Sequence, residues 1–243
     1  MSLLKPTIIR FDMDGTTVRH IHPKLLHILE KLDDASHKTA KYFSGVFRRR
    51  IDAMPLVEFH DGKRPKLLVH RALHKFRRKD VEEIVEPCPG IYAILDLLKE
   101  QGIPLGLVSN GLGKGYGHDI LNKFDLAKYF QVTIFREDIT RSKPYPDPIL
   151  QGIRGLARQP EKGDVIWYIG DRRKDVLAAI AAQDYLPCPV QPLAYGLNAS
   201  IAVLEHNVGV DHIVMAWQDL EIKLRQLLDI APKAAAPAKD RMP

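Results

Sequence analysis

Two carboxylates placed directly after a buried strand constrain the fold of this chain most strongly. Asp12 and Asp14 follow the apolar run 7–11, and Gly15 allows the backbone to turn sharply after them. Residues two apart in an extended chain point to the same side, so both carboxylates are expected to face one pocket. Like charges at this spacing require a proton or a cation between them. Mg2+ suits such a pair because it prefers oxygen ligands, although a solvated turn would use the same residue types.

Three later segments place further polar residues where a parallel sheet would gather them. The apolar run 105–108 ends in a small hydroxyl and an amide, which together with backbone N–H groups suit a phosphoryl oxygen. The proline-rich loop 141–148 makes a poor helix but a good holder for one lysine charge. The apolar run 165–169 leads into two more acids. The residues concerned are Ser109, Asn110, Lys143, Asp171 and Asp175.

Each of these segments also has an ordinary structural interpretation. A Ser-Asn-Gly sequence is a common turn, a loop lysine is usually solvated, and Asp171 or Asp175 would also cap a helix over 176–182. The four segments nevertheless occur in one chain, three of them at the carboxyl ends of apolar runs. Open parallel sheets bind ligands at that edge. The combination therefore favours one shared site.

The apolar periodicity predicts an α/β fold. The segment 91–100 has apolar residues at helical spacing and ends near Gly102. Similar helical patterns separate most of the expected strands, and this alternation predicts a parallel sheet with helices on both faces. Two further amphipathic helices are expected over 23–32 and 66–78. The expected strands are 7–12, 104–109, 132–135, 164–169 and 211–215.

The ordered motifs carry a family resemblance. The order DMDGT, then Ser-Asn, then a Lys-Pro loop, then GDxxxD resembles the haloacid dehalogenase superfamily of phosphohydrolases, from Ile8 to about Leu220. The segment between the first two motifs is similar to the helical cap of the phosphoglycolate phosphatase-like branch. The stretch 87–91 resembles the return hinge of that branch.

The resemblance implies a division of the chain into domains. The core would be a Rossmann-like parallel sheet formed by 1–16 and 87–230, and 17–86 would form an inserted all-helical cap. The Ala- and Pro-rich tail, 231–243, lacks a core-forming pattern and is expected to be disordered.

The resemblance also implies chemical roles for the acids. Asp12 would attack phosphorus and form an aspartyl-phosphate, and Asp14 would act as the general acid and base. For Mg2+, the implied ligands are the carboxylates of Asp12 and Asp171 and the backbone carbonyl of Asp14. Asp175 would act through water or by orienting its neighbours.

The remaining motif residues would hold the phosphoryl group. The resemblance implies that Ser109, the Asn110 backbone and Lys143 surround the phosphoryl oxygens. Lys143 would also offset the negative charge that the acids bring together.

The acid at Asp14 distinguishes between members of the superfamily. Dehalogenases of this fold lack it because a halide leaving group needs no proton, so carbon–halogen chemistry is disfavoured. A phosphomutase would share the acid, and it remains the alternative with the same fold.

Four basic residues depart from the family pattern. Arg19 and His20 occupy positions where relatives commonly have an Asp-Ser pair, and Arg172 and Arg173 replace small polar residues. The two arginines are expected either to be solvated or paired with surface acids, or to bind a second anionic group on the substrate.

Positive charge is concentrated in the predicted cap. Residues 37–80 contain 13 Lys and Arg against 4 Asp and Glu, a net charge of +9 in a chain of net +6. A basic lid would raise the local concentration of anionic substrates, but the same charges would also serve solubility. Nucleic-acid binding through these charges is the alternative from another functional class. It is disfavoured, because the aromatic residues among the charges are expected to pack the cap interior.

Cysteine use and hydropathy favour an ordinary enzyme of the cytoplasm. Cys88 and Cys188 are far apart in sequence and are expected to be buried or incidental thiols, without a disulfide. The first expected strand leaves no room for a secretory signal, and no apolar run is long enough to cross a bilayer. We therefore expect a Mg2+-dependent phosphatase that acts on a small anionic phosphorylated metabolite and needs no membrane. The sequence leaves its oligomeric state open.

Overall fold

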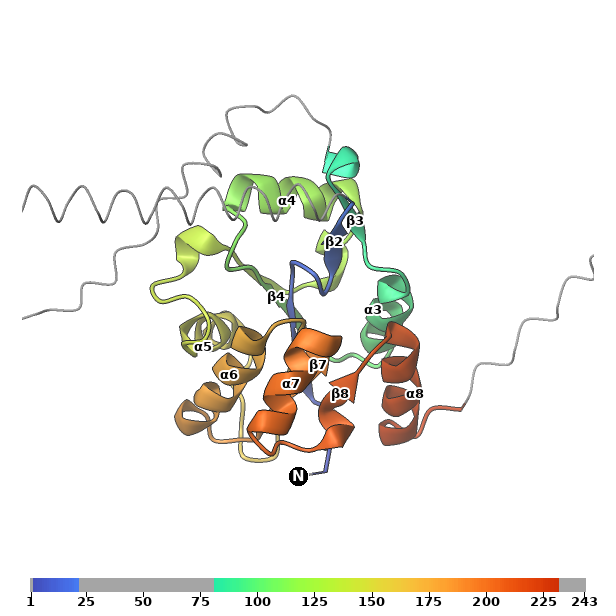
Figure 1. Ribbon diagram of the computed structural model, residues 1–243, viewed down its shortest axis with the longest axis vertical. Coiled ribbons are helices and arrows are strands. Elements are labelled where there is room, and N and C mark those ends of the chain that lie inside the picture. Colours follow the sequence, from blue (N-terminus) through green and yellow to red (C-terminus); the bar gives the residue numbers. More distant parts are fainter. Residues whose placement is uncertain (1, 22–80, 232–243) are drawn as a thin grey trace, which may run out of the picture.

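The computed structural model describes residues 2–21 and 81–231 and contains a parallel six-stranded sheet (Figure 1). All neighbouring strands in this sheet pair in parallel, which confirms the predicted α/β class. In spatial order the strands are β5 (Val132–Ile134), β4 (Leu105–Val108), β1 (Ile8–Asp12), β6 (Ile166–Gly170), β7 (Val190–Tyr195) and β8 (Ile213–Val214).

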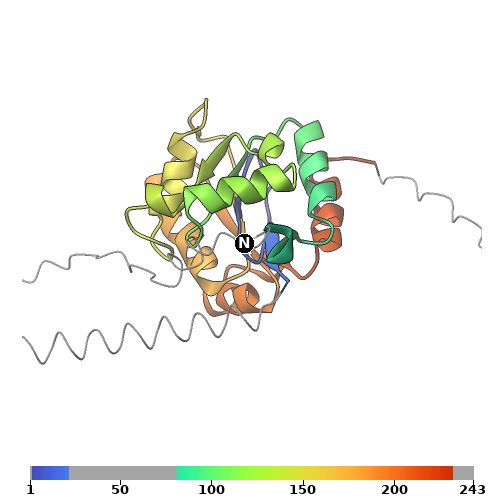
Figure 2. The same cartoon turned by 90° about the horizontal axis from the view of Figure 1, so that it is seen from above.

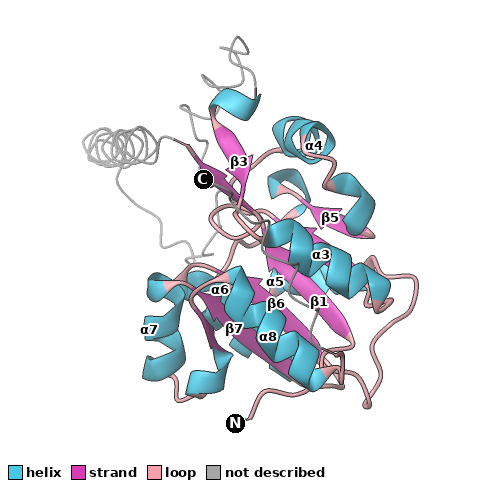
Figure 3. Cartoon of the chain, turned by 90° about the vertical axis from the view of Figure 1, so that its right-hand side faces the viewer, coloured by secondary structure: helices cyan, strands magenta, loops and turns pink. Residues whose placement is uncertain are grey.

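Helices cover both faces of the sheet. Seen from above, the green α3 and the red α8 lie on one side, and the yellow α5 and orange α6 lie on the other (Figure 2). Figure 3 shows α3 and α8 side by side in front of the sheet. The α-helices are α3 (Ile91–Glu100), α4 (Lys114–Lys123), α5 (Asp147–Arg154), α6 (Arg173–Ala182), α7 (Leu197–Glu205) and α8 (Trp217–Leu227). Short 3-10 turns lie at Val81–Glu83, Ala127–Tyr129, Arg136–Asp138, Gln183–Tyr185 and Val210–His212.

The central strand β1 alternates between the two layers. Ile9 and Phe11 pack in the core that contains α3 and α8, whereas Ile8 packs with residues of α5 and α6. Because the side-chain period of a strand is two, Asp12 leaves β1 on the same side as Ile8. The strand therefore directs its terminal carboxylate toward the α5 and α6 layer.

Arg10 interrupts the apolar run of β1 and is fully buried in the same layer. Its Nη2 donates to the Gly152 carbonyl at 2.8 Å. Gly106 gives it room, because a Cβ at that position would lie 1.5 Å from the Arg10 Nη1 atom. Burial lowers the pKa of Arg10 to about 10.

A second, two-stranded sheet pairs the described segments on either side of residues 22–80. The strands β2 (Val18–His20) and β3 (Val85–Pro87) pair antiparallel. The expectation that 17–86 is all-helical is therefore wrong at both ends of that range, because the chain pairs with itself there. The helices expected over 23–32 and 66–78 fall outside the described residues, as does most of the expected tail. The domain boundaries therefore remain a prediction.

The strand β7 was not expected from the sequence, and Pro192 explains why. A proline cannot donate to a ladder, so it argues against an internal strand. Here the Pro192 carbonyl contacts the His212 Nδ1 atom at 2.8 Å, and His212 precedes the first residue of β8. The Pro192 nitrogen, which carries no hydrogen, faces the side of the sheet on which β8 lies. The pairing of β7 with β8 begins only at Ala194, so Pro192 removes no hydrogen bond from that ladder.

The cysteines and the described helices agree with what the sequence predicts. Cys88 and Cys188 are free and buried, which confirms that they form no disulfide. Within the described ranges, each helix is too short or too polar to cross a bilayer.

A buried carboxylate fixes the chain ahead of β6. Asp164 accepts hydrogen bonds at 2.8 Å from the Thr7 hydroxyl, from two Arg158 nitrogens and from the Glu161 N–H. The Arg158 hydrogen bonds, opposed by burial and supported by the other two donors, hold the pKa of Asp164 well below its usual value.

The Asp164→Asn substitution is expected to lower Tm by about 2–4 °C at pH 7, because it weakens hydrogen bonds to a charged acceptor. A depressed folded-state pKa stabilises the protein above the unfolded value of about 3.9, and this stabilisation is lost as the pH falls below it. The difference in Tm should therefore shrink at acidic pH. Scanning calorimetry at several pH values measures it, with the exposed Asp211→Asn as the control. Equal Tm values at pH 7 would contradict this account of Asp164.

Candidate functional site

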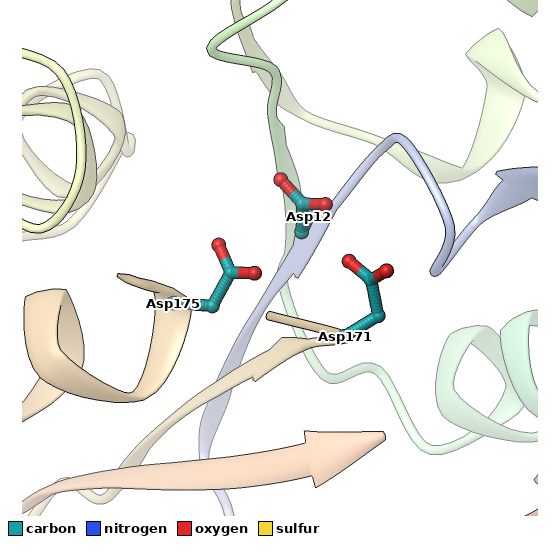
Figure 4. A group of neighbouring side chains, drawn as sticks. All are labelled: Asp12, Asp171 and Asp175. Atoms are coloured by element: carbon teal, nitrogen blue, oxygen red, sulfur yellow. The ribbon is translucent and has the colours of Figure 1, made fainter. Parts of the chain in front are cut away.

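Three carboxylates meet at the carboxyl edge of the sheet (Figure 4). Asp12 ends β1, Asp171 follows β6 directly, and Asp175 lies in the first turn of α6. One oxygen atom from each residue lies within 4.8 Å of the others. Asp12 and Asp175 are buried, whereas Asp171 is partly exposed. The acid cluster, as we call these three residues, thus combines two strand ends and one helix start.

Two glycines make room for the acid cluster. Gly15 adopts φ +86°, which favours glycine, and a Cβ there would lie 2.3 Å from the Asp171 Oδ2 atom. A Cβ at Gly170 would lie 2.4 Å from that of Asp175. The glycines of the first and last motifs are therefore required by the close approach of these carboxylates.

Asp175 has a structural contact in addition to its place in the cluster. Its Oδ2 atom accepts the Arg172 N–H at 3.0 Å, which caps the start of α6. The other oxygen, Oδ1, faces Lys143. Helix capping and membership of the acid cluster, which the sequence presented as alternatives, thus coexist in one side chain.

Lys143 links two members of the acid cluster. Its buried Nζ atom contacts Asp12 Oδ1, lies 2.6 Å from Asp175 Oδ1, and donates to the Tyr168 hydroxyl oxygen at 3.0 Å. The loop that carries Lys143 is fixed by Arg141, which forms two 2.9 Å contacts with Asp147 at the start of α5. The ammonium therefore lies between two carboxylates.

Burial and crowding change the ionisation of the acid cluster. Burial, with the nearby Asp175, raises the pKa of Asp12, although Lys143 opposes the shift. Burial and Asp175 also raise the pKa of Asp171 to about 6. The pKa of Lys143 is raised in spite of its burial, because Asp12, Tyr168 and Asp175 favour the charged ammonium. The cluster thus holds more negative charge than one lysine neutralises.

Asp14 lies beside this cluster and faces other partners. Its Oδ2 atom accepts the Ser109 hydroxyl at 3.3 Å, and its Oδ1 atom lies 3.8 Å from His20 Nε2. Burial alone would raise the pKa of Asp14, but His20, Arg172 and Lys143 outweigh it, so the pKa is lowered. The Ser109 oxygen also accepts the Leu112 N–H at 3.0 Å, which fixes the turn after β4.

Asn110 follows Ser109 at the same turn. Its side-chain oxygen is buried, and no hydrogen-bond partner for it is found among the described residues. At Gly111, an added Cβ would lie 3.3 Å from the Asp14 Oδ2 atom. The turn after β4 therefore packs closely against Asp14.

The chemistry of the acid cluster fits a divalent cation. Three carboxylates within one coordination distance supply the oxygen ligands that Mg2+ prefers. Asp171 Oδ1 is buried and has no hydrogen-bond partner in the described part of the chain, so it is available as a ligand. A cation would also offset the charge that raises the pKa values of Asp12 and Asp171.

The four basic residues that depart from the family pattern have different surroundings. Arg19 pairs with Glu86 at 2.7 Å across the β2–β3 ladder, and Arg173 pairs with Glu205 of α7 at 3.0 Å. Arg172 lies beside the acid cluster, with Nε 3.9 Å from Asp171 Oδ2. Arg173 therefore pairs with a surface acid, as one of the two expectations had it. Arg172 lies near Asp171 instead, and His20 lies near Asp14.

The structure brings most of the motif residues together. Asp12, Asp171, Asp175 and Lys143 form one contiguous group, and Ser109 contacts Asp14 beside it. The side chain of Asp14 is not among the three carboxylates of the acid cluster.

Sequence reasoning missed the part that Tyr168 takes in this group. Tyr168 belongs to an apolar run, which predicts core packing, and it is indeed fully buried. Its hydroxyl nevertheless reaches Lys143. The one available signal was the alternation of side chains along the strands. Tyr168 pairs with Arg10, so its side chain lies on the same face of the sheet as that of Asp12.

With this geometry in place, comparison with known proteins establishes the family. The model of the haloacid dehalogenase-like hydrolases matches residues 9–184. The chain therefore belongs to this family of hydrolases, and Asp12, Asp171 and Asp175 form the kind of acidic group that is typical of its Mg2+ site.

Curated relatives include several phosphoglycolate phosphatases. The enzyme of Shigella boydii serotype 4 is 34% identical over 137 residues, which cover 55% of this chain and 51% of the relative. The enzyme of Salmonella typhimurium is 30% identical over 166 residues, covering 68% and 63% respectively. The chain thus spans about half the length of the first of these relatives and is distantly related to them.

Solved structures share the fold at lower sequence identity. A predicted phosphatase from Clostridium acetobutylicum has a TM-score of 0.61 at 20% identity, covering 93% of this chain and all of that one. A predicted phosphoglycolate phosphatase from Haemophilus somnus has a TM-score of 0.59, also at 20% identity, with coverage of 91% and 100%. These likenesses support the architecture.

The Asp171→Asn substitution is expected to weaken Mg2+ binding more than about tenfold, because an amide is a neutral and poorer ligand of the same shape. Isothermal titration calorimetry with MgCl2 measures the affinity, and the exposed Asp184→Asn is the control of equal charge change. Unchanged Mg2+ affinity in the Asp171 variant would contradict the assignment of a cation to the acid cluster.

Proposed function

We propose that this protein is a Mg2+-dependent phosphatase that hydrolyses a small phosphorylated metabolite through an aspartyl-phosphate, in the manner of phosphoglycolate phosphatases. The observation that carries the proposal is the buried Lys143 ammonium between Asp12 and Asp175, with Asp171 completing the acid cluster and Asp14 alongside. Family membership supports the same chemistry.

Asp12 is the nucleophile of the first step. A carboxylate oxygen of Asp12 attacks phosphorus, the aspartyl-phosphate bond forms, and the bond from phosphorus to the substrate's ester oxygen breaks. Lys143 and the Ser109 hydroxyl favour the charge that develops on the phosphoryl oxygens, together with the Asn110 N–H. A phosphate monoester is thereby converted into an acyl phosphate that water cleaves more readily.

Asp14 transfers the protons of both steps. It gives its proton to the departing alkoxide, and it then takes a proton from the water that attacks the phosphoryl group of Asp12. The second displacement releases inorganic phosphate and regenerates the Asp12 carboxylate. Asp14 is ionised in the substrate-free protein, and a phosphate dianion beside it favours the protonated form that the first step requires.

Asp12 and Asp171, with the Asp14 backbone carbonyl, are the residues proposed to hold Mg2+, and Asp175 is proposed to act through water or by orienting Lys143. The bound cation supplies electrostatic stabilisation of the phosphoryl oxygens and keeps the nucleophile ionised. The chain contributes a largely buried setting for Asp12, Asp175 and Lys143, in which charges interact more strongly than in water.

The remaining parts of the proposal concern specificity. A cap formed within 17–86, beyond the β2–β3 ladder, would close on the core, and its positive charge would attract an anionic substrate. A screen of small phosphorylated metabolites with Mg2+, measuring released phosphate, would identify the substrate class. Stoichiometric release of phosphate separates a hydrolase from a phosphomutase, which would return the phosphoryl group to a sugar.

The Asp12→Asn variant is expected to fold normally and to lose at least about a thousandfold in kcat, because an amide does not replace the nucleophile. Phosphate release from p-nitrophenyl phosphate measures this, and circular dichroism verifies the fold. The exposed Asp184→Asn variant serves as the matched control. Normal turnover by the Asp12 variant would remove the proposed mechanism.

The Asp14→Asn variant separates the two steps. A p-nitrophenolate leaving group needs no proton, so the first displacement should proceed, but attack by water lacks its base. Rapid mixing should therefore show a burst of one p-nitrophenol per chain followed by turnover slowed by about a hundredfold or more. Steady turnover at the wild-type rate would show that Asp14 has no such role.

A further inference from the structure

The bonding of Lys143 leaves a question that the proposed function does not answer. An ammonium has three N–H donors. Three oxygen atoms surround Lys143 Nζ: Asp12 Oδ1, Asp175 Oδ1 and the Tyr168 hydroxyl oxygen. Asp12 and Tyr168 accept hydrogen bonds from it, whereas Asp175 Oδ1 lies at ion-pair distance and accepts none. One N–H donor therefore remains for a phosphoryl oxygen, which would compete with Asp175 for the ammonium.

The three partners differ in what competes for them. The Asp12 and Asp175 carboxylates belong to the acid cluster. A divalent cation and the incoming phosphorus would compete with Lys143 for Asp12, and a water bound to the cation would compete with it for Asp175. The phenol oxygen of Tyr168 is a neutral acceptor on β6, outside the acid cluster. It therefore stays available to the lysine when the carboxylates change partners.

The surroundings of Tyr168 make it a rigid support. Its side chain is 1% exposed and packs among residues of β6, α5 and α6. In the sheet register it lies opposite Arg10, two residues below the level of Asp12. The Lys143 ammonium lies 5.5 Å from the centroid of the Tyr168 ring, near the ring edge that carries the hydroxyl, so the hydroxyl oxygen is the group that holds it.

We propose that Tyr168 is a positioning residue, whose hydroxyl holds the Lys143 ammonium at the phosphoryl site while the carboxylate partners of the lysine are exchanged. Tyr168 does not touch the reacting atoms in this account. Its hydrogen bond keeps the Lys143 ammonium in place when Asp12 or Asp175 moves, so that one N–H donor points to the phosphoryl group. The inference deepens the proposed function and depends on it for its kinetic consequence.

The Tyr168→Phe variant removes the hydroxyl and leaves the ring. We expect kcat for p-nitrophenyl phosphate to fall about tenfold and KM to change less than about twofold, because a misplaced lysine loses its contact in the transition state. Tyr92→Phe is the matched control, since it removes a hydroxyl that donates to the Phe124 carbonyl outside the site. A kcat within twofold of the wild-type value would overturn the proposal.

A double-mutant cycle with Lys143→Met separates positioning from general packing. If Tyr168 acts through Lys143, its replacement should have no further effect on kcat once the lysine is absent. If the two losses multiply, Tyr168 acts independently of Lys143 and the proposal is wrong.

A spectroscopic measurement on the metal-free protein tests the contact without activity. A buried, hydrogen-bonded ammonium exchanges its protons slowly, so a sharp 15N-lysine NH3+ resonance is expected in the wild-type protein and should be absent from Lys143→Met. In Tyr168→Phe this resonance should shift or broaden, whereas Tyr92→Phe should leave it unchanged. An unaltered resonance in Tyr168→Phe would overturn the proposal even if the protein hydrolyses no phosphate. An inactive wild-type protein with the predicted NMR changes would instead refute the proposed function alone.

Should Tyr168→Phe fail to fold, a crystal structure of the wild-type protein with MgCl2 and tungstate decides the question. The Tyr168 Oη to Lys143 Nζ contact should persist while at least one carboxylate contact of Lys143 breaks. A separated tyrosine and lysine in that structure would overturn the inference.

Discussion

The contact of Lys143 with Asp12 and Asp175 is the interaction on which the site depends. Carboxylates buried this close together raise one another's pKa values, and the fold tolerates them because a cationic group lies between them. One ammonium does not balance the charge of three acids, so the site also favours a divalent cation. The excess negative charge destabilises the metal-free site, and it favours binding of Mg2+, beside which a phosphoryl group can then lie.

The parallel sheet explains how these residues meet. β1 and β6 are neighbours, and both end at the same edge, so Asp12 and Asp171 approach one another although they are far apart in sequence. α6 follows β6 after a short turn and adds Asp175. Gly15 and Gly170 permit the approach because neither carries a Cβ at the points of closest contact. Topology thus supplies the proximity, and small residues supply the space.

Much of this arrangement could be predicted from the sequence. The strands of the sheet other than β7 were expected, because each is an apolar run bounded by polar or turn residues, and helix α3 was predicted over the range that it occupies. The motif acids could be assigned to one edge of the sheet from strand polarity alone. The strand β7 was hidden by Pro192, whose harmlessness depends on where the neighbouring strand begins. The contact between Tyr168 and Lys143 was not predicted either, because an apolar run does not indicate which group the hydroxyl of its tyrosine contacts. Both features depend on how segments that are distant in sequence are aligned in the fold, and the local sequence pattern does not specify that alignment.

Asp12 is proposed to carry the phosphoryl group during turnover. The most direct test is to mix the protein with Mg2+ and a hydrolysable phosphate ester, quench the reaction in acid within milliseconds, and locate the modification by mass spectrometry of the proteolytic peptides. We expect one phosphoryl group, on Asp12. A phosphoryl group on another residue, or rapid phosphate release with no modified peptide at any time, would contradict it.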